Sequence, residues 1–178
     1  MSWKSIKDDD GGRFVEFLSR VRPEKELRSL PPSLLSIDPG ETVGWSYWEY
    51  DRAKYCGQLE LGPHRVGWGV TLHKLLGRFR PSVIVIERFS LYAWKAKSQS
   101  WSEMYTSRVI GAVEIWAQLQ SPPIKVVFQG AGVAKPFCTN DKLRQWGLLQ
   151  TVTQLRHAND ALRHACYYLL FSKTLPGK

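Results

Sequence analysis

The feature that most constrains the fold of this chain is a pair of short apolar runs, each of which ends in a carboxylate residue. Residues 34–37 lead into Asp38, and Pro39-Gly40 turns the chain immediately afterwards. Residues 83–86 lead in the same way into Glu87. Runs of this length and composition predict buried strands. Functional groups of α/β sheets gather at the carboxyl ends of parallel strands, so we expect Asp38 and Glu87 to face each other.

The order of the predicted elements indicates an α/β protein. Strands are expected at 34–38, 44–50, 54–61, 82–88 and 124–128, and helices at 65–79, 101–119, 137–149 and 158–172. The short connections between the first three strands predict antiparallel pairing, and the helical crossovers predict parallel strands after them. We therefore expect a five-stranded mixed sheet flanked by helices. The first strand should lie centrally, with the fourth beside it and parallel to it.

The N-terminal residues differ from the rest of the chain. They carry three consecutive aspartates, a Gly-Gly pair and then apolar residues at helical spacing between Phe14 and Val21, before Pro31-Pro32. We interpret residues 1–32 as a mobile arm with one short amphipathic helix, whose simplest role is to pack on the main domain. Residues 33–178 then form a single domain.

The charge of the chain indicates a polyanionic partner. Its formal charge is +9, and residues 62–178 hold sixteen basic residues against five acidic ones, which include Glu87 and Asp160. A basic surface with few acids is typical of nucleic-acid-binding proteins, although a merely solvated basic surface is the alternative. The three cysteines lack the spacing of a zinc site and are expected to be reduced thiols. No apolar stretch approaches the ~20 residues of a membrane span.

A fourth candidate group lies near the C-terminus, where His157-Ala158-Asn159-Asp160 opens the last predicted helix. Asp38, Glu87 and Asp160, with His157, are the residue types that hold hard divalent cations, and two such ions can clamp a phosphodiester. Each residue has a structural alternative as a turn, ion-pair, helix-capping or surface residue. Helical spacing places His164 on the same side as His157 and Asp160. We expect His164 to be a buried histidine rather than a supporting residue of the site.

These motifs together resemble the RuvC family of Holliday-junction resolvases, within the ribonuclease H-like superfamily. Residues 37–45 (IDPGETVGW) resemble the family's first motif, and residues 85–88 (VIER) its second. Residues 107–112 (SRVIGA) resemble the helix that follows, and residues 157–162 (HANDAL) the last motif. The similarity spans residues 33–172 in order, but His157 stands where most members carry an acid.

The resemblance implies a ribonuclease H-like fold and a crossover junction endodeoxyribonuclease that hydrolyses DNA phosphodiesters. Asp38 would lie between two Mg²⁺ ions, which Mn²⁺ could replace, while Glu87 and Asp160 would hold one ion each. His157 would complete the second site, as a ligand or a proton-transfer group. The compact size is similar to that of phage-borne members, which implies a bacterial or phage-infected host cytoplasm.

The resemblance also implies branched DNA as the partner, without membrane contact, and a homodimer that cuts two strands symmetrically. The candidate DNA-binding residues are Arg88, Phe89, Tyr92, Lys95, Lys97, Lys135 and Lys142, with Phe89 and Tyr92 as candidates for a wedge at the junction centre. Helix 101–119 is a candidate dimer interface. A debranching, ribonuclease H-type or terminase-type nuclease, or a non-catalytic nucleic-acid-binding module, remains open at this point.

Overall fold

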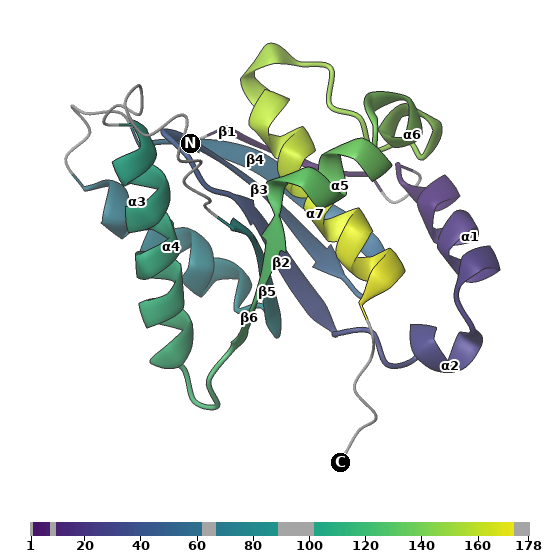
Figure 1. Cartoon of the computed structure of the whole chain (residues 1–178), viewed down its shortest axis with the longest axis horizontal. Coiled ribbons are helices and arrows are strands. Elements are labelled where there is room, and N and C mark those ends of the chain that lie inside the picture. Colours follow the sequence, from purple (N-terminus) through teal and green to yellow (C-terminus); the bar gives the residue numbers. More distant parts are fainter. Residues whose placement is uncertain (1, 8–9, 62–66, 89–101, 173–178) are drawn as a thin grey trace.

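A computed structural model describes residues 2–7, 10–61, 67–88 and 102–172. They form a mixed sheet in the order β1-β4-β3-β2-β5-β6 with helices on both faces (Figure 1). The strands are β1 (Ser2–Ser5), β2 (Ser33–Asp38), β3 (Thr42–Glu49), β4 (Arg52–Glu60), β5 (Val83–Arg88) and β6 (Lys125–Gly130). β3 pairs antiparallel with β2 and β4, while β2, β5 and β6 are mutually parallel. The predicted central position of β2 beside β5 is confirmed.

The predicted count of five strands is wrong because the N-terminal arm supplies a sixth. β1 pairs antiparallel with β4 at the edge of the sheet. Helix α1 (Gly12–Val21) follows, and it buries Phe14 and Leu18 completely. This packing on the main domain is the simplest role that the sequence predicted for the arm, and its mobility stays a prediction. A short helix, α2 (Glu24–Leu27), leads into β2. The division of the chain at residues 32 and 33 stays a prediction.

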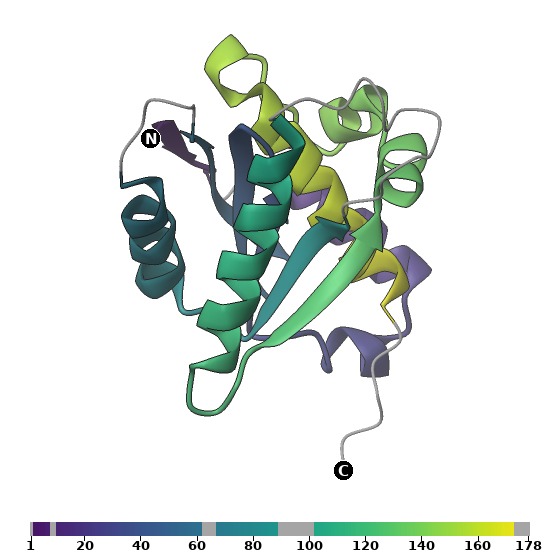
Figure 2. The same ribbon diagram turned by 60° about the vertical axis from the view of Figure 1, so that its left-hand side comes forward.

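The sheet separates two apolar cores. Because side chains alternate along each strand, successive residues point into different cores. Helices α3 (Trp68–Phe79) and α4 (Ser102–Gln118) cover one face, and α7 (Arg156–Phe171) with α1 covers the other (Figures 1 and 2). In β2, Leu35 and Ile37 pack toward α3 and α4, whereas Leu34 packs toward α7. The same alternation directs Asp38 to the α7 side.

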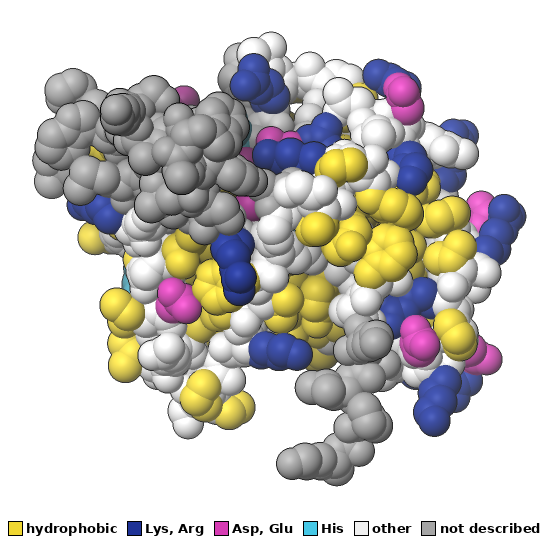
Figure 3. Space-filling view, viewed as in Figure 1, with side chains coloured by type: hydrophobic (Ala, Val, Ile, Leu, Met, Phe, Trp, Pro, Cys, Tyr) yellow, Lys and Arg dark blue, Asp and Glu magenta, His cyan; other side chains and the backbone are white. Residues whose placement is uncertain are grey.

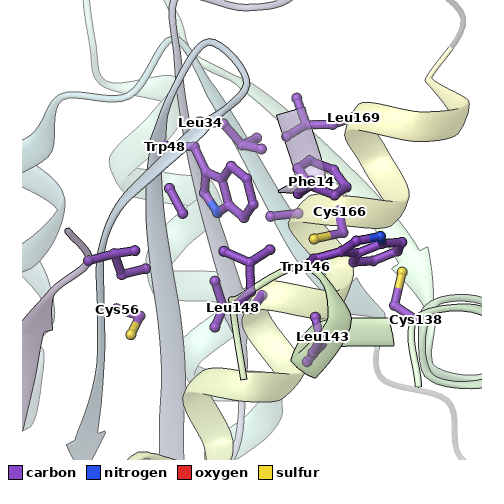
Figure 4. Close-up of a cluster of buried hydrophobic side chains, with 14 of the residues drawn as sticks. Phe14, Leu34, Trp48, Cys56, Cys138, Leu143, Trp146, Leu148, Cys166 and Leu169 are labelled. Atoms are coloured by element: carbon purple, nitrogen blue, oxygen red, sulfur yellow. The ribbon is translucent and has the colours of Figure 1, made fainter. Parts of the chain in front are cut away.

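The core beneath α1 and α7 is built largely from aromatic side chains. Phe14 contacts Trp48 and Trp146 edge-on, with ring centroids 5.6 and 5.1 Å apart. Leu148, Cys138 and Cys166 lie in the same cluster (Figure 4). This core fixes α1 and α7 on the same face of the sheet.

The helix predicted over 137–149 is shorter in the structure, where α6 occupies that range, and a separate helix before it was not predicted. α5 (Ala131–Phe137) contains Pro136 and ends at Cys138, whose backbone is not helical. α6 (Asn140–Gln145) then begins with the Thr139 side chain accepting a hydrogen bond from the Lys142 amide. A 3₁₀ turn, Thr153–Leu155, precedes α7. No helix among the described residues is long and apolar enough to cross a membrane.

Candidate active site

The site is built on one row of residues that crosses five strands. The β3 pairings align Asp38 of β2 with Gly44 of β3, and Gly44 with Gln58 of β4. On the other side, the parallel pairing of β2 with β5 continues from Ile37 and Ile86 toward Asp38 and Glu87. Glu87 is aligned in turn with Gln129 of β6. The sheet therefore presents a polar row at the carboxyl ends of its parallel strands, where the sequence predicted Asp38 and Glu87 to meet.

The N-terminus of α7 is held against this row by backbone contacts. Gly44 has no side chain there, and a Cβ atom at this position would lie 1.9 Å from the His157 carbonyl oxygen. The His157 amide donates a 2.6 Å hydrogen bond to Oε1 of Gln58. This bond satisfies one of the amides that a helix N-terminus leaves without a partner. The glycine of the first motif is thus explained by the close approach of α7.

The first turn of α7 adds two side chains to Asp38. His157 Nδ1 lies 3.6 Å from Oδ2 of Asp38. One ligand-type atom each from Asp38, His157 and Asp160 lies within 4.8 Å of the other two. The Asp38 side chain is 11% exposed, Asp160 is 23% exposed and His157 is 38% exposed. Three of the four predicted catalytic residues thus form a compact group that opens toward solvent on the His157 side.

Glu87 contacts a different part of α7. Its Oε2 atom lies 2.8 Å from Nε2 of His164, and Nδ1 of the same ring lies 2.8 Å from Oε1 of Gln129. His164 is completely buried. The expectation that His164 is only a buried histidine is therefore incomplete, because its ring orients Glu87. In the sequence, only the helical spacing of His164 from Asp160 indicated that His164 lies at the site, and nothing indicated a role for Gln129.

Two basic side chains approach the acids of the site. Lys135 Nζ lies 3.5 Å from both Glu87 Oε2 and Asp160 Oδ2. Arg163 binds Asp160 through one guanidinium nitrogen and Asn140 through another, and its Nε donates a 2.9 Å hydrogen bond to the Cys138 carbonyl. The sequence predicted Lys135 as a DNA-binding residue, and the structure places its ammonium group between two of the acids.

These contacts shift the pKa values of the acids in opposite directions. Burial raises the pKa of Asp38, and the charges of Glu87 and Asp160 add to this effect, while the hydrogen bond with His157 only partly offsets it. Burial also acts to raise the pKa of Glu87, but the His164 hydrogen bond and the Lys135 charge outweigh it, so that pKa is lowered. Burial acts to lower the Lys135 pKa, but the neighbouring carboxylates outweigh it and raise that pKa.

The donor set at the open part of the site fits a divalent cation. Two carboxylates and an imidazole converge there, and carboxylate oxygens are the protein ligands that Mg²⁺ and Mn²⁺ prefer. Burial makes an ionised Asp38 costly, and a bound cation would offset that cost. Glu87 lies outside the group of three and already has His164 and Lys135 as partners.

Of the other predicted DNA-binding residues, two lie on described elements and four do not. Arg88 follows Glu87 but is on the opposite face of β5, with its guanidinium 5.8 Å from the centre of the Phe128 ring. Lys142 lies on α6, with Nζ 3.6 Å from the centre of the Phe137 ring. Phe89, Tyr92, Lys95 and Lys97 lie outside the described residues.

Comparisons with known proteins identify the fold. No protein-family model and no curated protein sequence matches the chain. Among solved structures, Thermus thermophilus RuvC in complex with Holliday junction substrate is similar, with a TM-score of 0.59 and 19% identity over 78% of this chain and 92% of that chain. Fowlpox virus resolvase with its substrate Holliday junction DNA has a TM-score of 0.55 and 12% identity, over 77% of this chain and 96% of that one. The chain therefore has the ribonuclease H-like fold of these resolvases.

Proposed function

We propose that the protein is a metal-dependent endonuclease that resolves four-way DNA junctions. The observation that carries this proposal is the convergence of Asp38, His157 and Asp160 near Glu87, at the carboxyl ends of β2 and β5, in a fold shared with two junction resolvases. The basic charge of the chain fits a nucleic-acid substrate. Solvent access beside His157 leaves one side of the site open to a DNA backbone.

In this proposal, Asp38, His157 and Asp160 hold one divalent cation, and Asp38 with Glu87 holds a second. The cations, Mg²⁺ or Mn²⁺, would supply positive charge at the scissile phosphate and acidify the attacking water. Glu87 is kept ionised by His164 and Lys135, so it is available as a ligand at neutral pH. Lys135 reaches both acids and can also contact the scissile phosphate from the same position.

The homodimer remains part of the proposal, because two symmetric cuts need two sites. Helix α4, the predicted interface, exposes Ile115, while Leu119 is exposed just beyond its end. Both line an apolar groove of about 380 Å³ shared with α3. We propose a second copy of this chain as the occupant of the groove. We also propose a cytoplasmic location, in a bacterial or phage-infected host cell.

The test uses a synthetic four-way junction with each strand labelled in turn. Wild-type protein with Mg²⁺ or Mn²⁺ is expected to cut two opposite strands at symmetric positions, and to leave the junction intact in chelator. Three-way and linear DNA of the same sequence provide the comparison for branch preference. Binding of the junction without cutting at any metal concentration would contradict the enzymatic function.

The alternatives give different results in the same assay. Equal cutting of three-way and four-way DNA would indicate a debranching nuclease. Cutting only of an RNA–DNA hybrid would indicate a ribonuclease H type, and cutting of linear duplex a terminase type. We favour four-way junctions because both structural neighbours are bound to them.

A further inference from the structure

A basic hollow lies between the N-terminal arm and α6, apart from the catalytic row. It has a volume of about 230 Å³ and lies between α1 and the end of α6. The lining side chains are Arg13, Glu16, Phe17, Arg20, Lys142, Gln145 and Trp146. The volume is several times the roughly 30 Å³ that one water molecule occupies in the liquid, so a hydrated phosphate group can enter.

The floor of the hollow is aromatic and well packed. The ring centroids of Phe17 and Trp146 are 5.4 Å apart, and Trp146 is 3% exposed. Phe14, on a neighbouring side of α1, anchors the same indole from within the core. The packing of α1 is therefore achieved by apolar side chains, and the two arginines of the hollow are not needed for it.

The rim of the hollow carries three cations against one acid. Arg13 and Arg20 are both exposed, and Arg13 has no ion-pair partner within the described part of the chain. Arg20 pairs with Glu16, but both side chains are well exposed, and such pairs exchange readily for other partners. Lys142 lies against the Phe137 ring, a contact that does not neutralise its charge. Arginine side chains that converge from one helix face suit the oxygens of a phosphate.

Helix α6 connects the hollow with the catalytic site. Arg163 joins Asp160 to Asn140, the first residue of α6, and Lys142 follows two residues later. Lys135 and Lys142 thus lie on consecutive helices between the acids and the arm. Figure 3 shows Lys and Arg side chains on the face that carries α5, α6 and α1.

We propose that this hollow binds a backbone phosphate of a duplex arm of the DNA substrate, away from the cleavage point. The inference rests on the proposed function, and it assigns the N-terminal arm a role in holding DNA. Phosphate contacts of this kind position a duplex without reading its sequence. Their contribution to affinity decreases steeply with salt, because binding releases counterions.

The test measures junction affinity over a salt series in an Asp38→Asn background, which prevents cutting. The double variant Arg13→Gln/Arg20→Gln is expected to bind on the order of tenfold more weakly, and its slope of log affinity against log salt should fall by about 0.9 for each phosphate that the hollow no longer neutralises. The matched control is Lys25→Gln/Arg28→Gln. It removes two charges from α2 and its C-terminal end in the same arm, outside the hollow, and should keep the affinity and slope of the parent.

The substitution Glu16→Gln is expected to strengthen junction binding, a result that misfolding would not produce. Among the described residues, Glu16 is the one acid that lines the hollow, so its substitution should make junction binding about two- to threefold tighter at low salt. Equal affinities and slopes for the hollow variants and the α2 control, with a parent that binds the junction, would overturn this inference alone. Wild-type protein that neither binds nor cuts a junction would overturn the proposed function and this inference with it.

Discussion

The contact between α7 and the sheet differs at its two ends, although the same face of the helix forms both. At the first turn, which we term the open end, Asp38, His157 and Asp160 converge beside solvent. Two turns later, at the closed end, His164 is completely buried between Glu87 and Gln129. One histidine is therefore available to a ligand, and the other is committed to the protein. The same helix thus carries one histidine that solvent reaches and one that orients a carboxylate of the site.

The largest expected effect is at the open end. Asp38→Asn removes the charge that would lie between the two cations, so junction cleavage should fall roughly 10³-fold or more. Junction affinity in chelator should stay within about twofold of wild type, because the side chain is nearly isosteric. Single-turnover cleavage and fluorescence anisotropy measure the two quantities. Loss of both together would mean that Asp38 is structural.

Gly44→Ala tests whether the open end depends on the close approach of α7. The added Cβ would meet the His157 carbonyl at 1.9 Å, so the first turn of α7 must move. We expect a loss of about 3 kcal/mol in the free energy of unfolding, measured with urea, and a strong loss of cleavage. Gly77→Ala is the control, because its Cβ would meet nothing within 4 Å. Equal stability of the two variants would show that the position of α7 does not depend on Gly44.

Substitution of the two histidines should lower the free energy of unfolding by different amounts. His164→Ala leaves the Glu87 and Gln129 side chains without their shared partner, so unfolding should become about 2–3 kcal/mol easier. His157→Ala should cost less than about 1 kcal/mol, because its side chain is 38% exposed. A smaller stability loss for His164→Ala than for His157→Ala would reverse the assignment of closed and open ends.

The smallest effect concerns pH. Asp38 has a pKa raised above 3.8, so the unfolded chain ionises first and stability falls as pH rises through that range. Glu87 has a pKa lowered below 4.5, so its contribution is present above 4.5 and is lost as pH falls through its folded value. In chelator at pH 7, Asp38→Asn should therefore melt about 2–4 °C higher than wild type and Glu87→Gln about 2–4 °C lower. Thermal unfolding at several pH values checks this, and shifts of the same sign would contradict it.

The sequence predicted the open end better than the closed end, for a physical reason. Strand-terminal acids and a helix-opening HxxD pattern are local signals, and they indicated Asp38, Glu87, His157 and Asp160 as one group. The partners of His164 come from β5 and β6, so only the pairing of strands far apart in sequence brings them to the ring.

Two features of the fold were missed for a similar reason. β1 has four residues without apolar alternation, so its place in the sheet depends on the exposed edge of β4. Helix α5, which contains Pro136, was not predicted, and the Thr139 cap begins α6 later than the predicted start at residue 137.

The position of α7 in the chain has a consequence for protein synthesis. Asp38 and Glu87 lie on strands that are made early, whereas His157, Asp160 and His164 belong to the last described helix. A growing chain therefore carries only two of the three acids of the site until α7 has left the ribosome. During that interval Asp38 and Glu87 lack their partners on α7. A chain that stops before Arg156 would contain all six described strands but would lack His157, Asp160 and the apolar face of α7.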